Sequence, residues 1–205
     1  MKLYYSPGAC SLSPHIALLE AGLPYDLVKV DLRAKKLENG DDFLQVNPKG
    51  PVPALALDTG EMVTEGPIII QMIADKVADK KLAPARDSNE RYKLLEWLNY
   101  ITTELHKNLG PMFSPVLADD AKAFFKDRAM GKFKYVDSQL AGREYLMGSQ
   151  FTVADGYLFT MIMWAQDRLG FDLSGLPNVT AYKARVAARP KVQEALKKEG
   201  LLKAA

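Results

Sequence analysis

The sequence has very little cysteine and no excess of charge of either sign. One cysteine in 205 residues rules out an intrachain disulfide, and we expect a reducing compartment such as the cytoplasm. The 27 basic and 25 acidic residues are mixed along the chain and give a net charge of +2. Without a sustained basic stripe to follow phosphate groups, nucleic acid is not an expected partner.

Long hydrophobic runs are also absent. The most apolar stretches, 67–74 and 157–165, are much shorter than the ~20 residues needed to cross a bilayer, so no membrane span is predicted. Pro7 and Gly8 interrupt the first residues before the apolar core of a secretion signal could form. We therefore expect the chain to begin as mature protein.

Several kinds of catalytic site are missing as well. Two histidines and one cysteine provide no metal-ligand spacing, so no metal is expected. The chain contains neither a glycine-rich phosphate loop nor a serine hydrolase motif.

What is present is the composition of a folded protein with two domains. Hydrophobic residues make up 48% of the chain and charged residues 25%, and two domains of ~100 residues fit its length. The first part begins with a short apolar strand at 2–5 and a helix that ends at Gly22. Ser11 and Ser13 can cap this helix, and a strand at 25–31 completes a βαβ unit.

A second run of elements completes the first domain. A lysine-rich connection and a short helical stretch around Phe43 lead to a hairpin of strands at 54–57 and 61–64. A helix follows, with Pro67 in its first turn. The order βαβ followed by ββα predicts an α/β fold, and the charged, proline-containing segment 79–89 is a predicted linker.

The rest of the chain shows helical periodicity. The helix predicted at 90–108 has one apolar side, and its opposite side carries Asn99, Thr103 and His106. The predicted domains are 1–78 and the all-α domain 90–205. Helices are expected at 90–108, 119–140, 152–167, 178–188 and 191–198.

Cys10 lies between the first strand and the first helix. Unpaired amides and the helix dipole favour a thiolate there, which makes Cys10 a candidate nucleophile or thiolate partner. The alternative is a small buried apolar residue, a common role of cysteine.

Two further pairs are candidates for ligand binding. Pro53 follows Val52 at a strand entrance, where a rigid bend can leave backbone groups free for a ligand, although an ordinary loop proline is the alternative. Glu65 and Gly66 stand at a helix start and could bind the two charges of an α-amino acid. A glutamate that only complements the helix dipole is the alternative.

Three polar positions are open to a structural interpretation. Thr152 and Asp155 have the spacing of a capping box, for which we favour a structural role. His106 and Lys107 stand at the end of a helix, where cations complement the helix dipole. They are either a solvated helix end or part of a functional site. His15 lies inside the first helix, and a packed or surface side chain is expected.

Six short motifs occur in order along nearly the whole chain: YYSPGACS, NPKG, VPAL, TEG, ELHK and FTVAD. Together they resemble the beta-class glutathione transferases of bacteria. The resemblance implies a homodimer of subunits that each join a thioredoxin-like domain to an all-helical domain. It also implies glutathione as co-substrate, a small electrophilic or apolar second substrate, and a role in detoxification.

The same resemblance assigns roles to the first-domain residues. Pro53 would follow a cis peptide bond, and Val52 would pair its backbone with the cysteinyl unit of glutathione. Glu65 and Gly66 would hold the γ-glutamyl end, with Gly66 in place of the serine that is common in the wider superfamily.

Further positions are assigned by the resemblance alone. Lys35, Asn99 and Lys107 match positions that line the glutathione site. Glu104 matches one that can reach the ligand of a partner subunit. Gly156 stands where the family has an apolar residue after the capping box.

The expected reaction is attack of the glutathione thiolate on an electrophilic carbon, with Cys10 and His106 near the sulfur. Ser11 is the alternative thiolate partner. One rival hypothesis keeps the fold and makes Cys10 a glutaredoxin-like reductase that acts through a mixed disulfide with glutathione. Another is a non-enzymatic interaction module built on the same scaffold.

Overall fold

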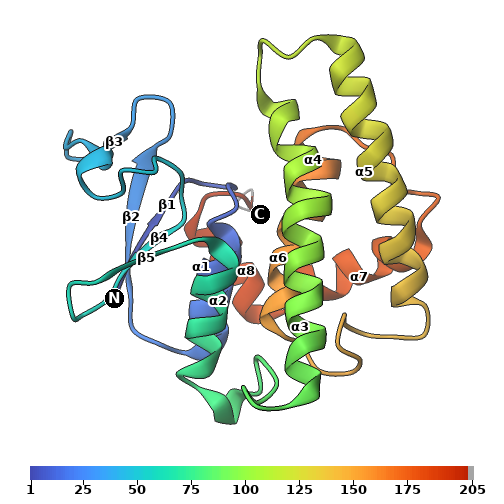
Figure 1. Ribbon diagram of the computed structural model, residues 1–205, viewed down its shortest axis with the longest axis horizontal. Helices are drawn as coiled ribbons and strands as arrows, with labels where there is room; N and C mark the ends of the chain where they lie inside the picture. Colours follow the sequence, from blue (N-terminus) through green and yellow to red (C-terminus); the bar gives the residue numbers. More distant parts are fainter. Residues whose placement is uncertain (203–205) are drawn as a thin grey trace. The chain divides into compact units, whose positions relative to one another are not determined.

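The computed structural model describes residues 1–202, which divide into two compact units (Figure 1). Unit 1 comprises Met1–Ala83 together with the segment that begins at Arg189, and unit 2 comprises Pro84–Ala188. The sequence assigned everything after residue 90 to the helical domain. The contacts instead group the last helix with the first unit.

Unit 1 is built on a mixed five-stranded sheet in the order β3-β2-β1-β4-β5. β1 and β2 are parallel, and the other neighbours are antiparallel. This is the predicted thioredoxin-like βαβ-ββα arrangement, and the predicted hairpin is confirmed. The two-residue β3 was not predicted, because two residues show no periodicity. The strands are β1 (Lys2–Tyr5), β2 (Asp26–Asp31), β3 (Lys36–Leu37), β4 (Ala54–Ala56) and β5 (Met62–Thr64).

The helices of unit 1 pack around α1. Every residue of α1 except Glu20 is buried, and the helix contacts both α2 and α8. Figure 1 shows α1 and α2 side by side. Arg189, just before α8, donates to both carboxylate oxygens of Glu20 at 2.7 and 2.9 Å. The helical elements are α1 (Leu12–Ala21), η1 (Phe43–Gln45), α2 (Gly66–Asp75), η2 (Ala78–Lys80) and α8 (Pro190–Lys198).

Ser11 occupies the N-cap position of α1, but neither its side chain nor that of Ser13 makes a capping hydrogen bond. The buried Ser11 hydroxyl donates to the Ser6 carbonyl at 3.3 Å and accepts from the Ser6 amide at 3.2 Å. The hydroxyl therefore closes the turn that precedes the helix and does not accept from a helix amide. The Ser13 hydroxyl is buried without a hydrogen-bond partner among residues 1–202. The predicted stop at Gly22 is confirmed by its left-handed backbone, with φ 69°.

Unit 2 is built from helices around a central one, α6. Almost all of α6 is buried, because the helix is apolar on every side. None of the helices formed by residues 1–202 has the length and apolar character that crossing a membrane requires. The elements are α3 (Asn89–Tyr100), η3 (Ile101–His106), α4 (Lys107–Leu109), η4 (Gly110–Phe113), α5 (Asp119–Leu140), α6 (Val153–Met163), η5 (Trp164–Arg168) and α7 (Pro177–Ala187).

The predicted capping box at the start of α6 is confirmed. The Asp155 carboxylate accepts from the Thr152 amide at 2.7 Å and from the Tyr182 hydroxyl at 2.8 Å. With Gly156 where an apolar residue was expected, the Phe151 ring packs edge-to-face on Tyr145 instead, at 5.6 Å between centroids. The structural interpretation of this motif therefore holds.

Two of the predicted helices, 90–108 and 152–167, are not α-helical throughout. Each contains a π-helical segment, η3 in the first and η5 in the second. The Lys107 amide donates to Thr102, and the Leu169 amide donates to Trp164, five residues back in both cases. The extra residue in each turn rotates the side chains that follow, so the faces predicted from α-helical spacing shift.

Candidate active site

Cys10 lies in the turn between β1 and α1. Its thiol donates to the Val52 carbonyl at 3.2 Å, so the sulfur lies against the backbone that precedes β4. The Ser11 amide, at the start of α1, has no acceptor anywhere in residues 1–202. That amide and the helix dipole provide positive potential beside Cys10.

The backbone around Val52 is held firmly. Val52 packs in a small core with Val30, Phe43 and Ala54. The peptide bond between Val52 and Pro53 is cis, as the family resemblance implied.

Gly66 lies beside Pro53. A Cβ atom added to Gly66 would be 3.7 Å from Pro53 Cγ, so the start of α2 approaches the cis proline closely. Since Cys10 contacts Val52, three predicted site segments, around residues 10, 52–53 and 65–66, meet in unit 1.

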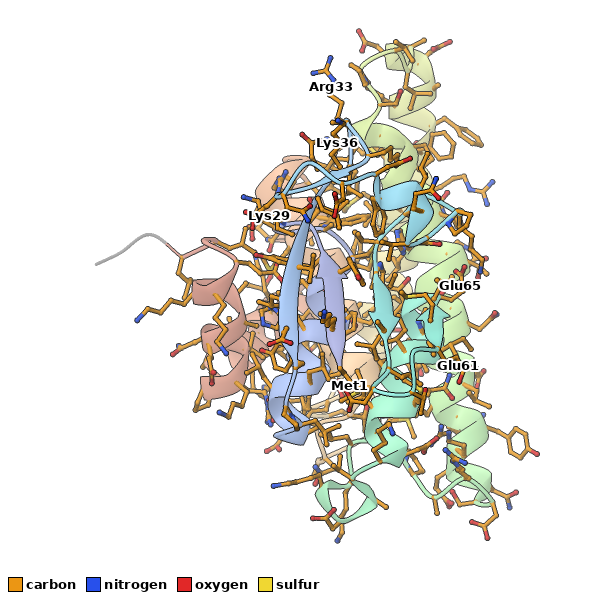
Figure 2. The ribbon with its side chains drawn as sticks, turned by 90° about the vertical axis from the view of Figure 1, so that its left-hand side faces the viewer. Met1, Lys29, Arg33, Lys36, Glu61 and Glu65 are labelled. Carbon is orange, nitrogen blue, oxygen red and sulfur yellow. The ribbon has the colours of Figure 1, made fainter. Side chains whose placement is uncertain are left out.

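Glu65 has an unusual backbone for a residue with a side chain. Its φ is 69° and its ψ is 110°, and such conformations occur mainly where function requires them. Its carboxylate does not cap α2 but lies exposed at the surface (Figure 2), 3.2 Å from the Lys49 ammonium. Lys49 also donates to Thr64 at 2.8 Å.

The start of α2 retains one backbone donor. The amides of Ile68 and Ile69 both donate to the Glu65 carbonyl, and Pro67 has no amide hydrogen. The Gly66 amide has no acceptor among residues 1–202 and can bind an anion, next to a carboxylate that can bind a cation. This pair suits the carboxylate and ammonium groups of an amino acid.

Lys35 contacts the backbone just before Val52. Its ammonium donates to the Gly50 carbonyl at 3.0 Å, two residues before Val52. Lys35 thus joins Cys10, Val52, Pro53, Glu65 and Gly66 in unit 1, whereas the hydroxyl of Ser11 is already used by Ser6.

The other predicted site residues follow one another along α3, η3 and α4 of unit 2. Asn99 and Lys107 are exposed. Glu104 pairs with the Lys132 ammonium of α5 at 2.7 Å, and this hydrogen bond lowers the pKa of the Glu104 carboxyl. Its carboxylate therefore already has a partner within the chain.

His106 is half-buried among aromatic rings. Its Nδ1 lies 2.6 Å from the Tyr157 hydroxyl, and its ring meets that of Trp164 edge-on at 4.9 Å. Burial, and to a smaller extent the charge of Lys107, lowers the pKa of His106 to about 4. The imidazole is therefore neutral at neutral pH and can donate one proton without carrying charge.

Sequence reasoning missed the aromatic neighbours of His106. Tyr157 and Trp164 lie in the apolar run 157–165, which indicated only a buried helix, and Phe113 packs on Trp164 at 5.0 Å. The two π-helical segments carry His106 and Trp164, and such segments occur often at functional sites.

The remaining candidates are accounted for structurally. His15 is fully buried with both ring nitrogens in hydrogen bonds, as expected for a packed histidine. In the part of the chain that the structure describes, no group of three or more histidine, cysteine or acidic side chains could hold a metal ion.

Comparison with known families matches both parts of the chain. Residues 8–76 match the family described as "Glutathione S-transferase, N-terminal domain". Residues 103–199 match "Glutathione S-transferase, C-terminal domain". The first match contains the segments around Cys10, Val52 and Glu65, and the second contains His106.

Similar proteins align with this chain over nearly its full length. Glutathione S-transferase GstA of Escherichia coli O157:H7 is 49% identical over 98% of this chain and 100% of its own. A sphingomonad glutathione S-transferase solved in complex with glutathione is 48% identical over 98% of this chain and 100% of its own, with a TM-score of 0.94. The beta-class enzyme of Sphingomonas chungbukensis is 49% identical over the same shares, with a TM-score of 0.95. The chain belongs to the glutathione S-transferase family, in its bacterial beta class, and is a transferase that uses glutathione.

Proposed function

We propose that the enzyme conjugates the glutathione thiolate to small electrophilic, largely apolar compounds, as in detoxification. The observation that carries this proposal is the meeting of Cys10, the Val52 backbone and the Glu65–Gly66 pair in unit 1. These groups match the parts of a γ-glutamyl-cysteinyl peptide. The non-enzymatic alternative is not retained, because the chain belongs to an enzyme family.

Binding of glutathione follows from the charges of the peptide. The Glu65 carboxylate would hold the ammonium group and the Gly66 amide the carboxylate of the γ-glutamyl unit, with Lys49 beside them. Val52 would pair its backbone with the cysteinyl unit. Glutathione has a second carboxylate, on its glycine, and Lys35 is the cation of unit 1 proposed for it. Asn99 and Lys107 of unit 2 are proposed to take part in glutathione binding on the family resemblance alone.

The chemical step depends on a stable thiolate. The start of α1, the Ser11 amide and the neutral imidazole of His106 can each favour the charged sulfur over the thiol. Lowering the thiol pKa by one unit corresponds to ~1.4 kcal/mol and raises the thiolate fraction nearly tenfold near neutral pH. The hydroxyl of Ser11 is the weaker candidate, because Ser6 already occupies it.

A second activity, disulfide reduction, is favoured by the position of Cys10 at a helix start. The Cys10 thiolate would attack a glutathionylated substrate, form a mixed disulfide with glutathione and release the substrate thiolate. A second glutathione thiolate would then attack that disulfide, which releases oxidised glutathione and restores the Cys10 thiolate. One cysteine suffices for this route.

Replacing Cys10 separates the two chemistries. In Cys10→Ala, disulfide reduction should fall to background, because the sulfur itself is the nucleophile. Conjugation should fall only about two- to twelvefold. Cys10 would supply the glutathione thiolate with one neutral hydrogen bond, and losing such a bond costs ~0.5–1.5 kcal/mol. Both rates are measured in one preparation, with Cys10→Ser as the control that keeps a donor for the Val52 carbonyl.

Complete loss of conjugation with intact glutathione binding would contradict the helper role of Cys10. Survival of both activities would exclude Cys10 from both reactions. In either case His106 and the Ser11 amide become the groups to test.

We also propose that the protein is a cytoplasmic homodimer. Family membership supports this, as do apolar side chains exposed on helices of each unit, such as Ile68 on α2 and Phe124 on α5. Sedimentation should give twice the mass of 22.7 kDa at micromolar concentration. A monomer at that concentration would contradict the proposal.

A further inference from the structure

The hydrogen bond between His106 and Tyr157 is short. The Nδ1 and hydroxyl oxygen are 2.6 Å apart, whereas hydrogen bonds donated by N–H to oxygen usually span ~2.7–3.2 Å. A phenol O–H is a better donor than its oxygen is an acceptor, and a neutral imidazole has one ring nitrogen that can only accept. The contact therefore favours the Tyr157 O–H as donor and the His106 Nδ1 as acceptor.

Tyr157 is well placed to hold the ring. It lies on the buried central helix α6, and its own side chain is buried, so the hydroxyl cannot easily move away. Trp164 meets the His106 ring at 88° and blocks rotation on another side. The imidazole is therefore held on two sides within unit 2, by Tyr157 and by Trp164.

The number of ring protons on His106 then determines whether its other nitrogen, Nε2, is protonated. With its pKa near 4, His106 carries one ring proton at neutral pH. Lys107 is the charged neighbour that acts on it, and Lys132, on the packed helix α5, is paired with Glu104. If Nδ1 accepts from Tyr157, the proton is on Nε2, which has no partner among residues 1–202.

We infer that Tyr157 is a positioning residue, which holds His106 as the tautomer whose Nε2–H donates a hydrogen bond to the sulfur of glutathione. The inference rests on the proposed function, since it places His106 at that sulfur. His106 then keeps its own proton throughout, and the thiol proton leaves to water or buffer. The imidazole stabilises the thiolate as a neutral donor and does not act as the base.

Nuclear magnetic resonance of ¹⁵N-histidine tests the tautomer without any substrate. The chain has two histidines, so His106→Gln assigns the signals. At pH 7 the wild type should show a bare Nδ1 and a protonated Nε2 for His106, and Tyr157→Phe should show a mixture of tautomers. Tyr100→Phe, which removes a hydroxyl bound to the Lys132 carbonyl in the same unit, should leave the signals unchanged.

A protonated Nδ1 in the wild type would overturn the inference, whether or not the Tyr157→Phe variant folds. An unchanged tautomer in a folded Tyr157→Phe variant would overturn it as well. Neither result depends on glutathione, so both stand apart from a failure of the proposed function.

The pH profile of conjugation tests the catalytic part. In Tyr157→Phe the rising limb of the pH profile of kcat/KM should move to higher pH. At pH values below this limb kcat/KM should be two- to twelvefold lower than in the wild type, and at higher pH it should recover. KM for glutathione should change less than about twofold, because the charged ends of the peptide are held elsewhere. A merely structural role would lower the rate equally at every pH and would overturn the inference.

An unchanged pH profile combined with the expected tautomer shift would mean that His106 does not face the sulfur. That outcome overturns both the catalytic part of the inference and the proposed place of His106. Absence of glutathione binding in the wild type would instead overturn the proposed function and leave the tautomer result standing.

Discussion

The two histidines of this chain have the same ring but different surroundings. His15 is fully buried in α1, with Nδ1 2.8 Å from the Glu199 carboxylate and Nε2 3.0 Å from the Tyr25 hydroxyl. The other oxygen of Glu199 accepts from the Gly8 amide at 2.9 Å. His15 thus belongs to a closed network that ties the segment after α8 to the turn before Cys10.

His106, by contrast, is half-buried and uses only Nδ1 within residues 1–202. A ring whose two nitrogens are satisfied has nothing left to offer a ligand, whereas a ring with one satisfied nitrogen is oriented and still has a donor or acceptor. The comparison shows that the number of partners, more than burial alone, separates a structural histidine from a candidate functional one.

The largest expected effect lies in the closed network. Glu199→Ala removes the acceptor of both the His15 Nδ1 and the Gly8 amide, and it should lower the free energy of unfolding by about 3–5 kcal/mol. Denaturant unfolding measures the change. The control is Glu194→Ala, also at the C-terminal end of the chain, whose exposed pairs with Lys191 and Lys198 should matter little. Equal free energies of unfolding for the two variants would contradict the claim that the buried network of Glu199 contributes more to stability than the exposed ion pairs of Glu194.

The second expected effect concerns activity. His106→Ala should lower kcat/KM for conjugation by roughly 10- to 150-fold, the equivalent of a lost hydrogen bond to a charged group at ~1.5–3 kcal/mol. Its free energy of unfolding should fall less than that of Glu199→Ala. Steady-state kinetics and denaturant unfolding on both variants test this contrast. A variant with full activity but lost stability would place His106 in the same structural class as His15.

The smallest expected effect is a pH dependence of stability due to His106. Its pKa is about 4 in the folded protein, below the ordinary value of 6.5, because of burial and Lys107. As pH falls below 6.5, the unfolded chain takes up a proton that the folded protein does not, so stability is lost progressively towards pH 4.

The loss between pH 7 and pH 5 should amount to about 1–2 kcal/mol at a half-buried site. Denaturant midpoints at the two pH values measure this loss in the wild type. The His106→Ala variant, which lacks the group, should lose less stability over the same interval. An equal loss in both proteins would show that other groups are responsible.

Most of the secondary structure could be predicted because it depends on local pattern. Apolar periodicity, turn residues and stop signals such as Gly22 predicted the main helices and every strand of the sheet except β3. The π-helical segments could not be predicted, because one extra residue per turn leaves the composition unchanged. The Ser11 hydroxyl does not cap the helix amides, because both of its hydrogen bonds go to the backbone of Ser6, and no local pattern shows that choice.

The candidate site was predictable only where its residues stand at the ends of elements. Cys10, Pro53 and Glu65 all lie at such ends, where backbone groups are left unpaired, and the ordered motifs gave them a common meaning. The roles of these residues remain proposals. Tyr157 was hidden in an apolar run that only a contact with His106 distinguishes from ordinary core.

The sequence by itself determined the order of strands and helices, the family and the identity of the polar groups available for chemistry. Local propensity and motif order carry that information along the chain. Only the tertiary structure decided the partners of each group, such as Glu199 for His15 and Tyr157 for His106. Those partners are 184 and 51 residues away, and no local pattern encodes which distant side chain packing will bring within hydrogen-bonding distance.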